Sequence, residues 1–459
     1  MNDKTIIVDL GVIPYEMVKD CIETSKYEII FIGNNFQIEP LRKLGVNNQL
    51  VEYNDFVNPV TEHIYPDNIE YSEIFQNIID NYQTMLIAER CSYRRGYRSN
   101  FNDVAKIDIM IENYLNFLYN KNIAFIFYQA CPHNINSWVF ANVAESLGIK
   151  VYMCNSTIFF WRNCLMEGVN SEKIVDLKSG DNTDPNINKY ISKMMQRYDN
   201  AIPEYEKQRL LRRKGKYWSW RDELVGAVKN YKKMLFLPFK YRLFKEYEKY
   251  SKKPCLKDNY IILFLHYQPE RTSMPEGRYF TNQWRIINII HRALPAGYKL
   301  YVKEHPSIFT NINYDPRYRD LNFYRNISKL ENVILIDSSV DTFSLIDNSV
   351  CISTITGTVG GESLFRGKAV LAFGNATYRG HKYVYSIKSE LDVKNALDNI
   401  RGISSKEISE YTQKVYVSDV LGISISGVDN TIETGEMLVF NKNIRNRSIS
   451  RILCKLLEE

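Results

Sequence analysis

Short apolar runs alternate with helical patterns twice along this chain, and this alternation limits its fold more than any other feature. The runs are rich in β-branched and aromatic residues, as buried strands are. Strands that alternate with helices predict a parallel, doubly wound sheet. The expected strands are residues 4–10, 27–33, 123–129 and 150–156 in the first region, and residues 259–267, 298–304, 332–337, 348–354 and 368–374 in the second.

The length of the chain, 459 residues, exceeds the size at which single hydrophobic cores stop growing. We therefore predict an α/β protein with two Rossmann-like domains. The expected parts are a first domain at 1–185, a basic helical linker at 186–255, a second domain at 256–400 and closing helices at 401–459.

Hydrophobic residues make up 45% of the chain and charged residues 24%, which is typical of a soluble globular protein. No apolar run approaches the roughly 18 residues that span a bilayer, and the first residues contain no long apolar segment like that of a signal peptide. We expect a cytoplasmic location. The eight cysteines form no C-x-x-C pair, so we expect reduced core cysteines and no zinc site.

Three ionisable residues, Lys303, Glu304 and His305, follow the second strand of the second region, and Pro306 ends that strand. The carboxyl ends of parallel strands are where open α/β sheets bind their ligands. His305 could donate a hydrogen bond to a phosphate oxygen, and Lys303 could add positive charge there. The alternative is that these charges are solvated at a strand end.

A Gly-rich turn, ISTITGTVGGESLFRG, joins a strand that ends at Thr354 to a helix that opens near Gly361. Small residues let backbone amides approach an anion, and a helix amino terminus adds partial positive charge. Glu362 could accept hydrogen bonds from ribose hydroxyls. The alternative is an ordinary strand-to-helix turn. The residues predicted to bind a nucleotide here are Ser353, Thr354, Thr356, Gly357, Thr358, Gly360, Gly361, Glu362 and Ser363.

These two motifs, with LHYQPERTSMPEG at 265–277, resemble bacterial capsular polysaccharide and surface-carbohydrate biosynthesis proteins. That group includes transferases of Kdo, an acidic sugar, from its CMP-activated form. The resemblance covers roughly residues 259–380. It implies a GT-B fold, in which two Rossmann-like domains face a central cleft, with a nucleotide-sugar in the second domain and an acceptor glycan in the first. It also implies that His305 contacts the nucleotide phosphate and that the 353–362 turn holds the nucleotide.

The run Gln268-Pro269-Glu270-Arg271 departs from the Kdo-transferase pattern, in which a glutamine is followed by acidic residues. Glu270 is its only carboxylate. Glu270 could act as a nucleophile at the anomeric carbon or as a base toward the acceptor hydroxyl. The alternative is a salt bridge of Glu270 with Arg271 or Arg278. We predict Glu270 and His305 as catalytic residues, and Gln268, Arg271, Lys303 and Glu304 as further substrate-binding residues.

In the first domain, Arg94, Arg95 and Arg98 lie among tyrosines, a composition suited to the carboxylates or phosphates of an anionic acceptor. His133 and Asn134 follow a predicted strand and are expected at the same ligand-binding edge. The alternatives are a solvated loop for the arginines and a helix cap for the other pair.

The sequence contains neither Asp-x-Asp nor H-E-x-x-H, so we predict that no metal is used and that positive side chains replace it.

Residues 207–253 carry 16 Lys or Arg and 4 Asp or Glu, a net charge of +12 against +6 for the whole chain. Trp218, Trp220 and the apolar run 234–239 lie in the same segment, and this combination predicts an anchor on an anionic membrane surface. A plain interdomain linker is the alternative. We expect no nucleic-acid partner, because no DNA- or RNA-binding motif accompanies the charge.

The favoured function is transfer of a sugar from a nucleotide-sugar, with a CMP-linked donor favoured, to a glycan or lipid-linked glycan of a surface polysaccharide. Kdo or a related acidic sugar is the candidate donor sugar, and the inner face of the cytoplasmic membrane is the expected place of action. A UDP-sugar hydrolysing epimerase and a non-catalytic capsule-assembly scaffold remain the alternatives.

Overall fold

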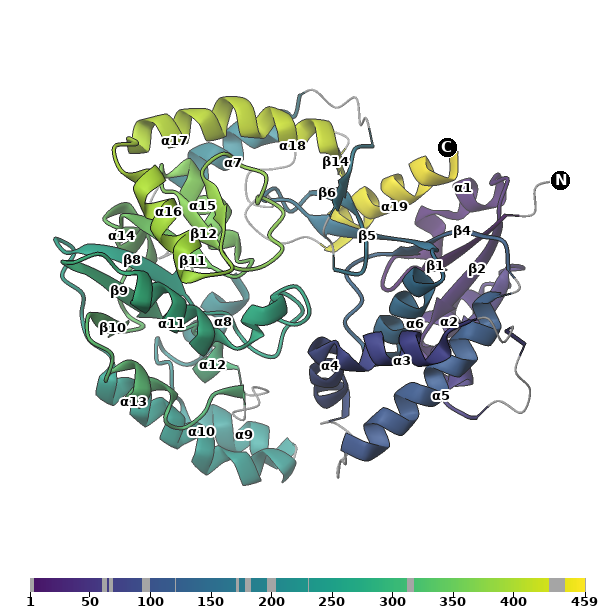
Figure 1. Cartoon of the computed structure of the whole chain (residues 1–459), viewed down its shortest axis with the longest axis horizontal. Helices are drawn as coiled ribbons and strands as arrows, with labels where there is room; N and C mark the ends of the chain where they lie inside the picture. The colour runs from purple at the N-terminus through teal and green to yellow at the C-terminus, as the bar shows by residue number, and fades with distance from the viewer. Residues whose placement is uncertain are drawn as a thin grey trace. The chain divides into compact units, whose positions relative to one another are not determined.

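The computed structural model describes residues 4–59, 64–65, 69–92, 100–119, 121–170, 173–177, 183–195, 204–229, 231–311, 318–428 and 442–458. The chain divides into two units. The first consists of Met1–Asn186 and Ser418–Glu459, and the second of Ile187–Val417. Each unit has its own sheet with flanking helices (Figure 1), which confirms the prediction of two Rossmann-like α/β domains.

The sheet of the first unit has the strand order β14-β6-β5-β4-β1-β2-β3, and β7 pairs with β6. The predicted strands β1, β2, β4 and β5 are parallel, and so is β3, which was not predicted, but β6, β7 and β14 add an antiparallel edge. The five residues between β5 and β6 explain the antiparallel pairing of these two strands, because they can close a hairpin but not a parallel crossover. The strands are β1 (Thr5–Asp9), β2 (Glu28–Gly33), β3 (Gln49–Glu52), β4 (Ile123–Tyr128), β5 (Lys150–Ser156), β6 (Arg162–Glu167), β7 (Lys173–Val175) and β14 (Ser424–Ser426).

The helices of the first unit include one from the far end of the chain. Helix α19 inserts Ile449 and Ile452 into the same core as Ile6 and Val8 of β1. The helices are α1 (Lys19–Glu23), α2 (Asn35–Lys43), α3 (Tyr71–Asp80), α4 (Tyr82–Ser92), α5 (Asn100–Tyr119), α6 (Ile135–Ser146), α18 (Val417–Ile423) and α19 (Lys442–Glu458).

A disulfide joins Cys21 of α1 to Cys454 of α19, 433 residues apart. The expectation that all cysteines are reduced is therefore wrong for this pair. The sequence could not indicate the pairing, because it depends on the return of α19 to the first unit.

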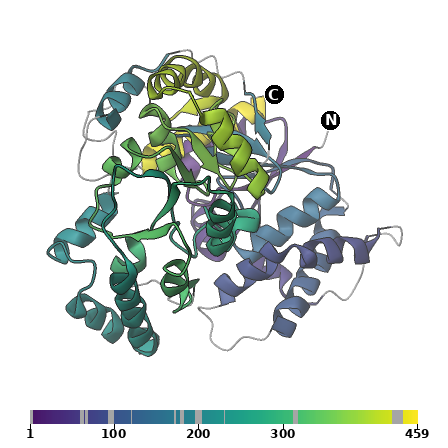
Figure 2. The same cartoon turned by 60° about the vertical axis from the view of Figure 1, so that its left-hand side comes forward.

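The sheet of the second unit is parallel throughout, with the order β10-β9-β8-β11-β12-β13. Numbered from its own first strand this order is 3-2-1-4-5-6, the Rossmann order, and right-handed crossovers then place helices on both faces (Figures 1 and 2). The strands are β8 (Asn259–Phe264), β9 (Tyr298–Lys303), β10 (Val333–Ile336), β11 (Cys351–Thr354), β12 (Val370–Ala372) and β13 (Val384–Ser386). The helices are α11 (Gln283–Ala293), α12 (Ser307–Thr310), α13 (Phe323–Ile327), α14 (Thr342–Asp347), α15 (Thr358–Phe365), α16 (Glu390–Ile400) and α17 (Ser405–Tyr411).

The segment predicted as a linker, 186–255, is helical but packs into the second unit. The Tyr247 hydroxyl donates to the Ile336 carbonyl over 2.7 Å, and Arg213 donates to the Phe309 carbonyl over 3.3 Å. The predicted closing part, 401–459, is also not one body, because the chain passes from one unit to the other at residue 417. The helices of the segment are α7 (Pro185–Met195), α8 (Glu204–Arg212), α9 (Trp220–Lys229) and α10 (Tyr231–Tyr250).

Within the described ranges, no helix combines the length and apolarity needed to cross a bilayer.

Candidate functional site

The candidate site lies where β8 and β11 run side by side in the second sheet. The chain leaves these two strands toward opposite edges of the sheet, so the loops after them part and leave room for a ligand. Residues 265–282 follow β8, and Ile355–Gly357 lead from β11 into α15.

His266 is the centre of a buried hydrogen-bond network at this point. Its Nε2 atom lies 3.0 Å from the Thr354 hydroxyl and accepts the backbone N–H of Thr356 over 3.3 Å. The backbone N–H of Gly357 donates to the same Thr354 hydroxyl, also over 3.3 Å. The network thus ties the first loop of the unit to the turn before α15.

The imidazole of His266 is neutral, and its hydrogen is on Nδ1. Burial lowers the pKa of His266 to about 3, and the positive charges of His305 and Arg319 lower it further. A nitrogen that accepts an amide N–H carries a lone pair, so Nε2 is the unprotonated atom. Nδ1 is then a hydrogen-bond donor, and the network fixes the orientation of the ring. Our sequence analysis missed His266, although its place directly after a strand could have indicated it.

The turn before α15 is packed too closely for side chains. A Cβ atom on Gly357 would lie 2.8 Å from the Thr354 hydroxyl, and one on Gly360 would lie 2.2 Å from the Tyr378 hydroxyl. That hydroxyl donates to the Gly357 carbonyl over 2.6 Å. The glycines are therefore required by the protein's own packing, a reason that the sequence analysis did not foresee.

Helix α15 starts at Thr358, three residues before the start expected near Gly361. Its N-cap, Gly357, offers no side chain to the first N–H groups, so the partial positive charge of the helix end is not offset by a capping side chain. Ser353 and Ser363 are completely buried, and Ser363 donates to the Val359 carbonyl over 2.6 Å. These two serines are not placed to touch a ligand, because β11 and α15 turn them into the core.

Glu362 lies in the second turn of α15 and is partly buried. Burial raises its pKa to about 7, while a hydrogen bond from Thr358 and the charge of Arg366 oppose the shift. Its carboxyl group therefore changes protonation near neutral pH.

Lys303 ends β9 as predicted, but its side chain does not point to the switch point of the sheet, the place where the loops after β8 and β11 part. Its ammonium group donates to the Val340 carbonyl and, over 3.0 Å, to the Thr342 hydroxyl. Burial lowers the pKa of Lys303 to about 8, and the carboxylates of Asp341 and Asp337 act in the opposite direction. Lys303 thus holds the loop between β10 and α14.

Glu304 is buried in a bidentate ion pair with Arg319. The two distances are 2.8 Å from Nε to Oε2 and 3.0 Å from Nη2 to Oε1. Oε2 also accepts the Tyr324 hydroxyl over 2.8 Å, and Arg319 donates to the Gln268 side chain over 2.9 Å. Glu304 and Gln268, predicted to bind substrate, are instead positioning residues of the loop after β8, because their polar atoms have partners within the protein.

His305, the predicted phosphate ligand, lies at the site. Its Nδ1 atom accepts the backbone N–H of Ser307 over 3.2 Å, and its ring centre lies 6.1 Å from that of Tyr267. Tyr267 is the neighbour of His266, and the charge of His305 lowers the His266 pKa. The structure therefore brings the two histidines together from two adjacent strand ends.

Glu270 is exposed on the loop after β8, and its carboxylate accepts the Thr272 hydroxyl over 3.1 Å. The Thr272 carbonyl accepts the Thr356 hydroxyl over 2.9 Å, so this loop is joined to the turn before α15. Arg271 lies 3.6 Å from a carboxylate oxygen of Glu276, a buried residue whose pKa is raised by that burial. Glu270 and Arg271 are thus on the site loop, and Arg271 pairs with Glu276.

The residues predicted in the first unit are only partly described. Arg94, Arg95 and Arg98 lie outside the described residues. His133 and Asn134 follow β4, with Nδ1 of His133 2.9 Å from the Cys131 carbonyl. Asn134 precedes α6 as its N-cap but its side chain makes no capping hydrogen bond, contrary to the alternative of a helix cap.

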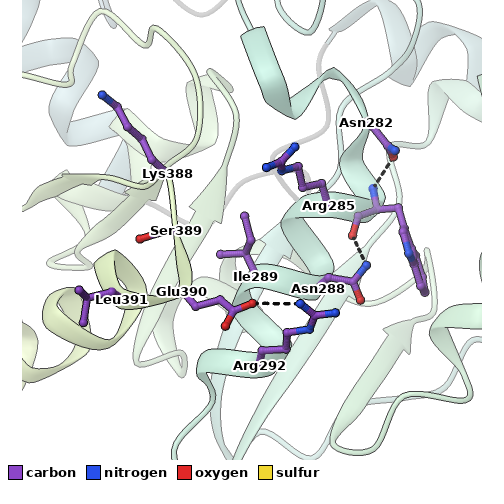
Figure 3. A pocket seen from close by; sticks show the side chains of 10 residues that line it. Asn282, Arg285, Asn288, Ile289, Arg292, Lys388, Ser389, Glu390 and Leu391 are labelled. Carbon is purple, nitrogen blue, oxygen red and sulfur yellow. Dashed lines mark hydrogen bonds and ion pairs between the residues drawn. The ribbon is translucent and has the colours of Figure 1, made fainter.

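An open pocket of about 640 Å³ lies between α11 and the start of α16 (Figure 3). Arg285 and Lys388 face it, and Arg292 pairs across it with Glu390 over 3.2 Å. Asn282, the last residue of the loop after β8, lines this pocket, but His266, His305 and the turn before α15 do not, so the pocket is separate from the candidate site.

In the described part of the chain, no group of three His, Cys, Asp or Glu side chains is arranged to hold a metal ion.

Comparison of the sequence with known families gives one match. Residues 271–383 match the family of capsule polysaccharide biosynthesis proteins. The matched stretch includes His305, Arg319, the turn before α15 and Tyr378. No curated protein sequence matches this chain.

Solved structures align with nearly the whole chain at low similarity. The KpsC β-Kdo 2,7-transferase of Thermosulfurimonas dismutans is 11% identical, with 97% of this chain and 99% of that chain covered and a TM-score of 0.33. The UDP-GlcNAc 2-epimerase of Methanocaldococcus jannaschii is 14% identical, with 90% and 99% covered and a TM-score of 0.25. The calicheamicin glycosyltransferase CalG4 is 9% identical, with 91% and 95% covered and a TM-score of 0.26.

Proposed function

We propose, from the premise that residues 271–383 match the capsule polysaccharide biosynthesis family, that this protein is a glycosyltransferase. It moves a sugar from a nucleotide-activated donor to a surface-polysaccharide acceptor. The observation that carries the proposal is the combination of His266, His305 and the uncapped start of α15 at the β8–β11 switch point.

The donor binds with its phosphate at the start of α15. The helix dipole favours negative charge there, and Nδ1–H of His266 donates a hydrogen bond to a phosphate oxygen. Because the imidazole of His266 is neutral, no buried charge is needed to bind the phosphate. His305 supplies a second hydrogen-bonding group beside His266. Glu362 accepts hydrogen bonds from ribose hydroxyls.

Glu270 acts on the sugar. It is exposed on a loop that is hydrogen-bonded to the turn holding the nucleotide, so its carboxylate is free to approach the anomeric carbon or the acceptor hydroxyl. A carboxylate can serve there as a nucleophile or as a general base.

The donor is CMP-linked and its sugar is Kdo or a related acidic sugar, as the sequence resemblance implies. The acceptor is a glycan or a lipid-linked glycan, bound by His133, Asn134 and the arginines 94, 95 and 98 of the first unit. The reaction takes place at the inner face of the cytoplasmic membrane and uses no metal.

The test is to incubate the purified protein with CMP-, UDP- and CDP-activated sugars, with and without a glycan acceptor. We expect binding of one nucleotide by calorimetry and release of it only when acceptor is present. Release of free sugar without acceptor would show a hydrolysing epimerase. Absence of nucleotide binding would show a scaffold.

A matched pair of variants locates the activity. His305→Ala should lower the rate of transfer at least tenfold, which is about 1.4 kcal/mol of transition-state stabilisation. His291→Ala, in the last turn of α11, should leave the rate unchanged. Equal rates in both variants would contradict the proposed site.

A further inference from the structure

The outer surface of residues 211–228 combines apolar and basic side chains. Five large apolar side chains, Leu211, Trp220, Leu224, Val225 and Val228, are between 47% and 83% exposed. The other exposed positions among the described side chains of this stretch are Arg212, Lys214, Gly215, Lys216 and Arg221. No acidic residue is among them.

Both acidic residues of the stretch pair with Arg213, and Glu223 is buried whereas the side chain of Asp222 is 35% exposed. The carboxylate of Glu223 accepts Arg213 over 2.9 Å and Lys240 over 2.7 Å, and all three side chains are buried. Asp222 lies 3.7 Å from Nε of the same Arg213. Asp222 is thus the one acidic residue of the stretch that reaches the outer surface in part, and its carboxylate lies beside the buried Arg213, so the exposed basic residues keep a net positive charge.

The apolar residues form a stripe along α9. Trp220, Leu224 and Val228 follow one another at intervals of four residues and so share one face of the helix, and Val225 lies beside them. Figure 1 shows α9 and α10 side by side along the edge of the second unit. Exposed apolar patches of this kind mark interaction sites on soluble proteins.

This surface differs from the anchor expected from the sequence. Trp218 is buried, with its ring stacked 5.5 Å from that of Phe244, and Lys240 is held by Glu223. Neither can reach a bilayer.

We propose that this face of α9, with the basic residues beside it, docks on an anionic lipid bilayer. An amphipathic helix binds in the interface plane when apolar side chains enter the acyl boundary and basic side chains meet anionic headgroups. The net positive charge of the exposed side chains of the stretch favours a negatively charged partner, and the apolar stripe favours a lipid surface over a polyanion. This inference rests on the surface and not on the proposed function.

The test measures binding of the full chain to vesicles by flotation. We expect binding to vesicles of phosphatidylcholine with 30% phosphatidylglycerol, weak binding to phosphatidylcholine alone, and weaker binding at high salt, because salt screens the headgroup attraction. The double variant Leu224→Ser with Val228→Ser should lower the partition coefficient at least tenfold. The triple variant Arg212→Gln, Lys216→Gln and Arg221→Gln should remove the preference for anionic vesicles.

The control is Phe36→Ser, a change of an equally exposed apolar residue on α2 of the first unit, which should not alter binding. All changed residues are on the surface, and circular dichroism checks that the variants fold. Equal vesicle binding by the wild type and the double variant would overturn the proposal. So would a wild type that ignores vesicles but forms a dimer that the double variant lacks.

Discussion

The backbone N–H of Thr356 donates to Nε2 of His266 over 3.3 Å, and this contact decides which ring nitrogen bears the hydrogen. Because Nε2 accepts, Nδ1 donates. The pKa of about 3 means that the ring keeps this state at every pH at which the protein would be assayed.

The first prediction replaces His266 by Gln. The Gln amide oxygen can still accept the Thr356 N–H, but the donor at the Nδ1 position is lost. We expect about a tenfold loss of nucleotide affinity by calorimetry, or about 1.4 kcal/mol, with the free energy of unfolding within about 1 kcal/mol of the wild type. Unchanged affinity would show that Nδ1 does not face the nucleotide.

The second prediction concerns the space at Gly360. In Gly360→Ala the new methyl group would collide with Tyr378, whose hydroxyl holds the Gly357 carbonyl. We expect at least a tenfold loss of nucleotide affinity and a loss of stability of about 1 to 3 kcal/mol, as for overpacked cores. Gly380→Ala is the control, because nothing lies within 4 Å of its Cβ position. If both variants bind alike, the packing of Tyr378 does not shape the site.

The third prediction concerns pH and Glu362. Its folded pKa of about 7 lies above the ordinary value of 4.5, so the folded protein binds the proton more tightly than the unfolded chain. The free energy of unfolding should therefore fall as pH rises from about 4.5 to about 7, and then level off. Glu362→Gln removes this term. We expect the variant to be more stable than the wild type by about 3 kcal/mol at pH 8 in urea unfolding, with a smaller difference at pH 5. A difference that does not depend on pH would contradict the raised pKa.

The fourth prediction concerns the buried group of Arg213, Glu223 and Lys240. Glu223→Ala leaves two buried cations without their carboxylate, and should cost about 3 to 5 kcal/mol in urea unfolding. Lys245→Ala is the control, because its pair with Glu248 is exposed and should contribute less than about 1 kcal/mol. Similar losses in the two variants would mean that the buried group does not stabilise the second unit.

The fifth prediction concerns metal. In the proposed site, His266, His305 and the amino terminus of α15 bind the leaving phosphate. Transfer should therefore continue at the wild-type rate in EDTA, measured as nucleotide release with acceptor present. Loss of activity that Mg²⁺ or Mn²⁺ restores would refute the metal-free mechanism.

The sequence predicted the strands whose residues are nearly all apolar, such as β1, β4 and β8, within a few residues of their ends. It did not predict β6, because this strand contains Arg162 and Asn163. Both are buried: Arg162 pairs with Asp184 over 3.2 Å, and Asn163 binds Ser448 over 3.0 Å. The hydrophobic pattern does not reveal a buried strand whose polar residues are hydrogen-bonded to partners distant in the sequence.

The candidate site was predictable only in its place along the sheet. Strand ends indicated His305 and the turn before α15, since parallel strands bring their carboxyl ends to one edge. The direction of each side chain was not predictable. Lys303 turns toward Thr342, and Glu304 turns toward Arg319, because partners remote in sequence compete for them.

The return of β14 and α19 to the first unit makes the second unit an insertion within the sequence of the first. A ribosome therefore releases the whole of β8 to β13 before it releases the helix that closes the core around Ile6 and Val8. The second unit can therefore fold before the last segment of the first unit has been synthesised. Proteolytic cleavage after residue 417 would leave the sheet of the second unit intact and would separate β14 and α19 from the rest of the first unit.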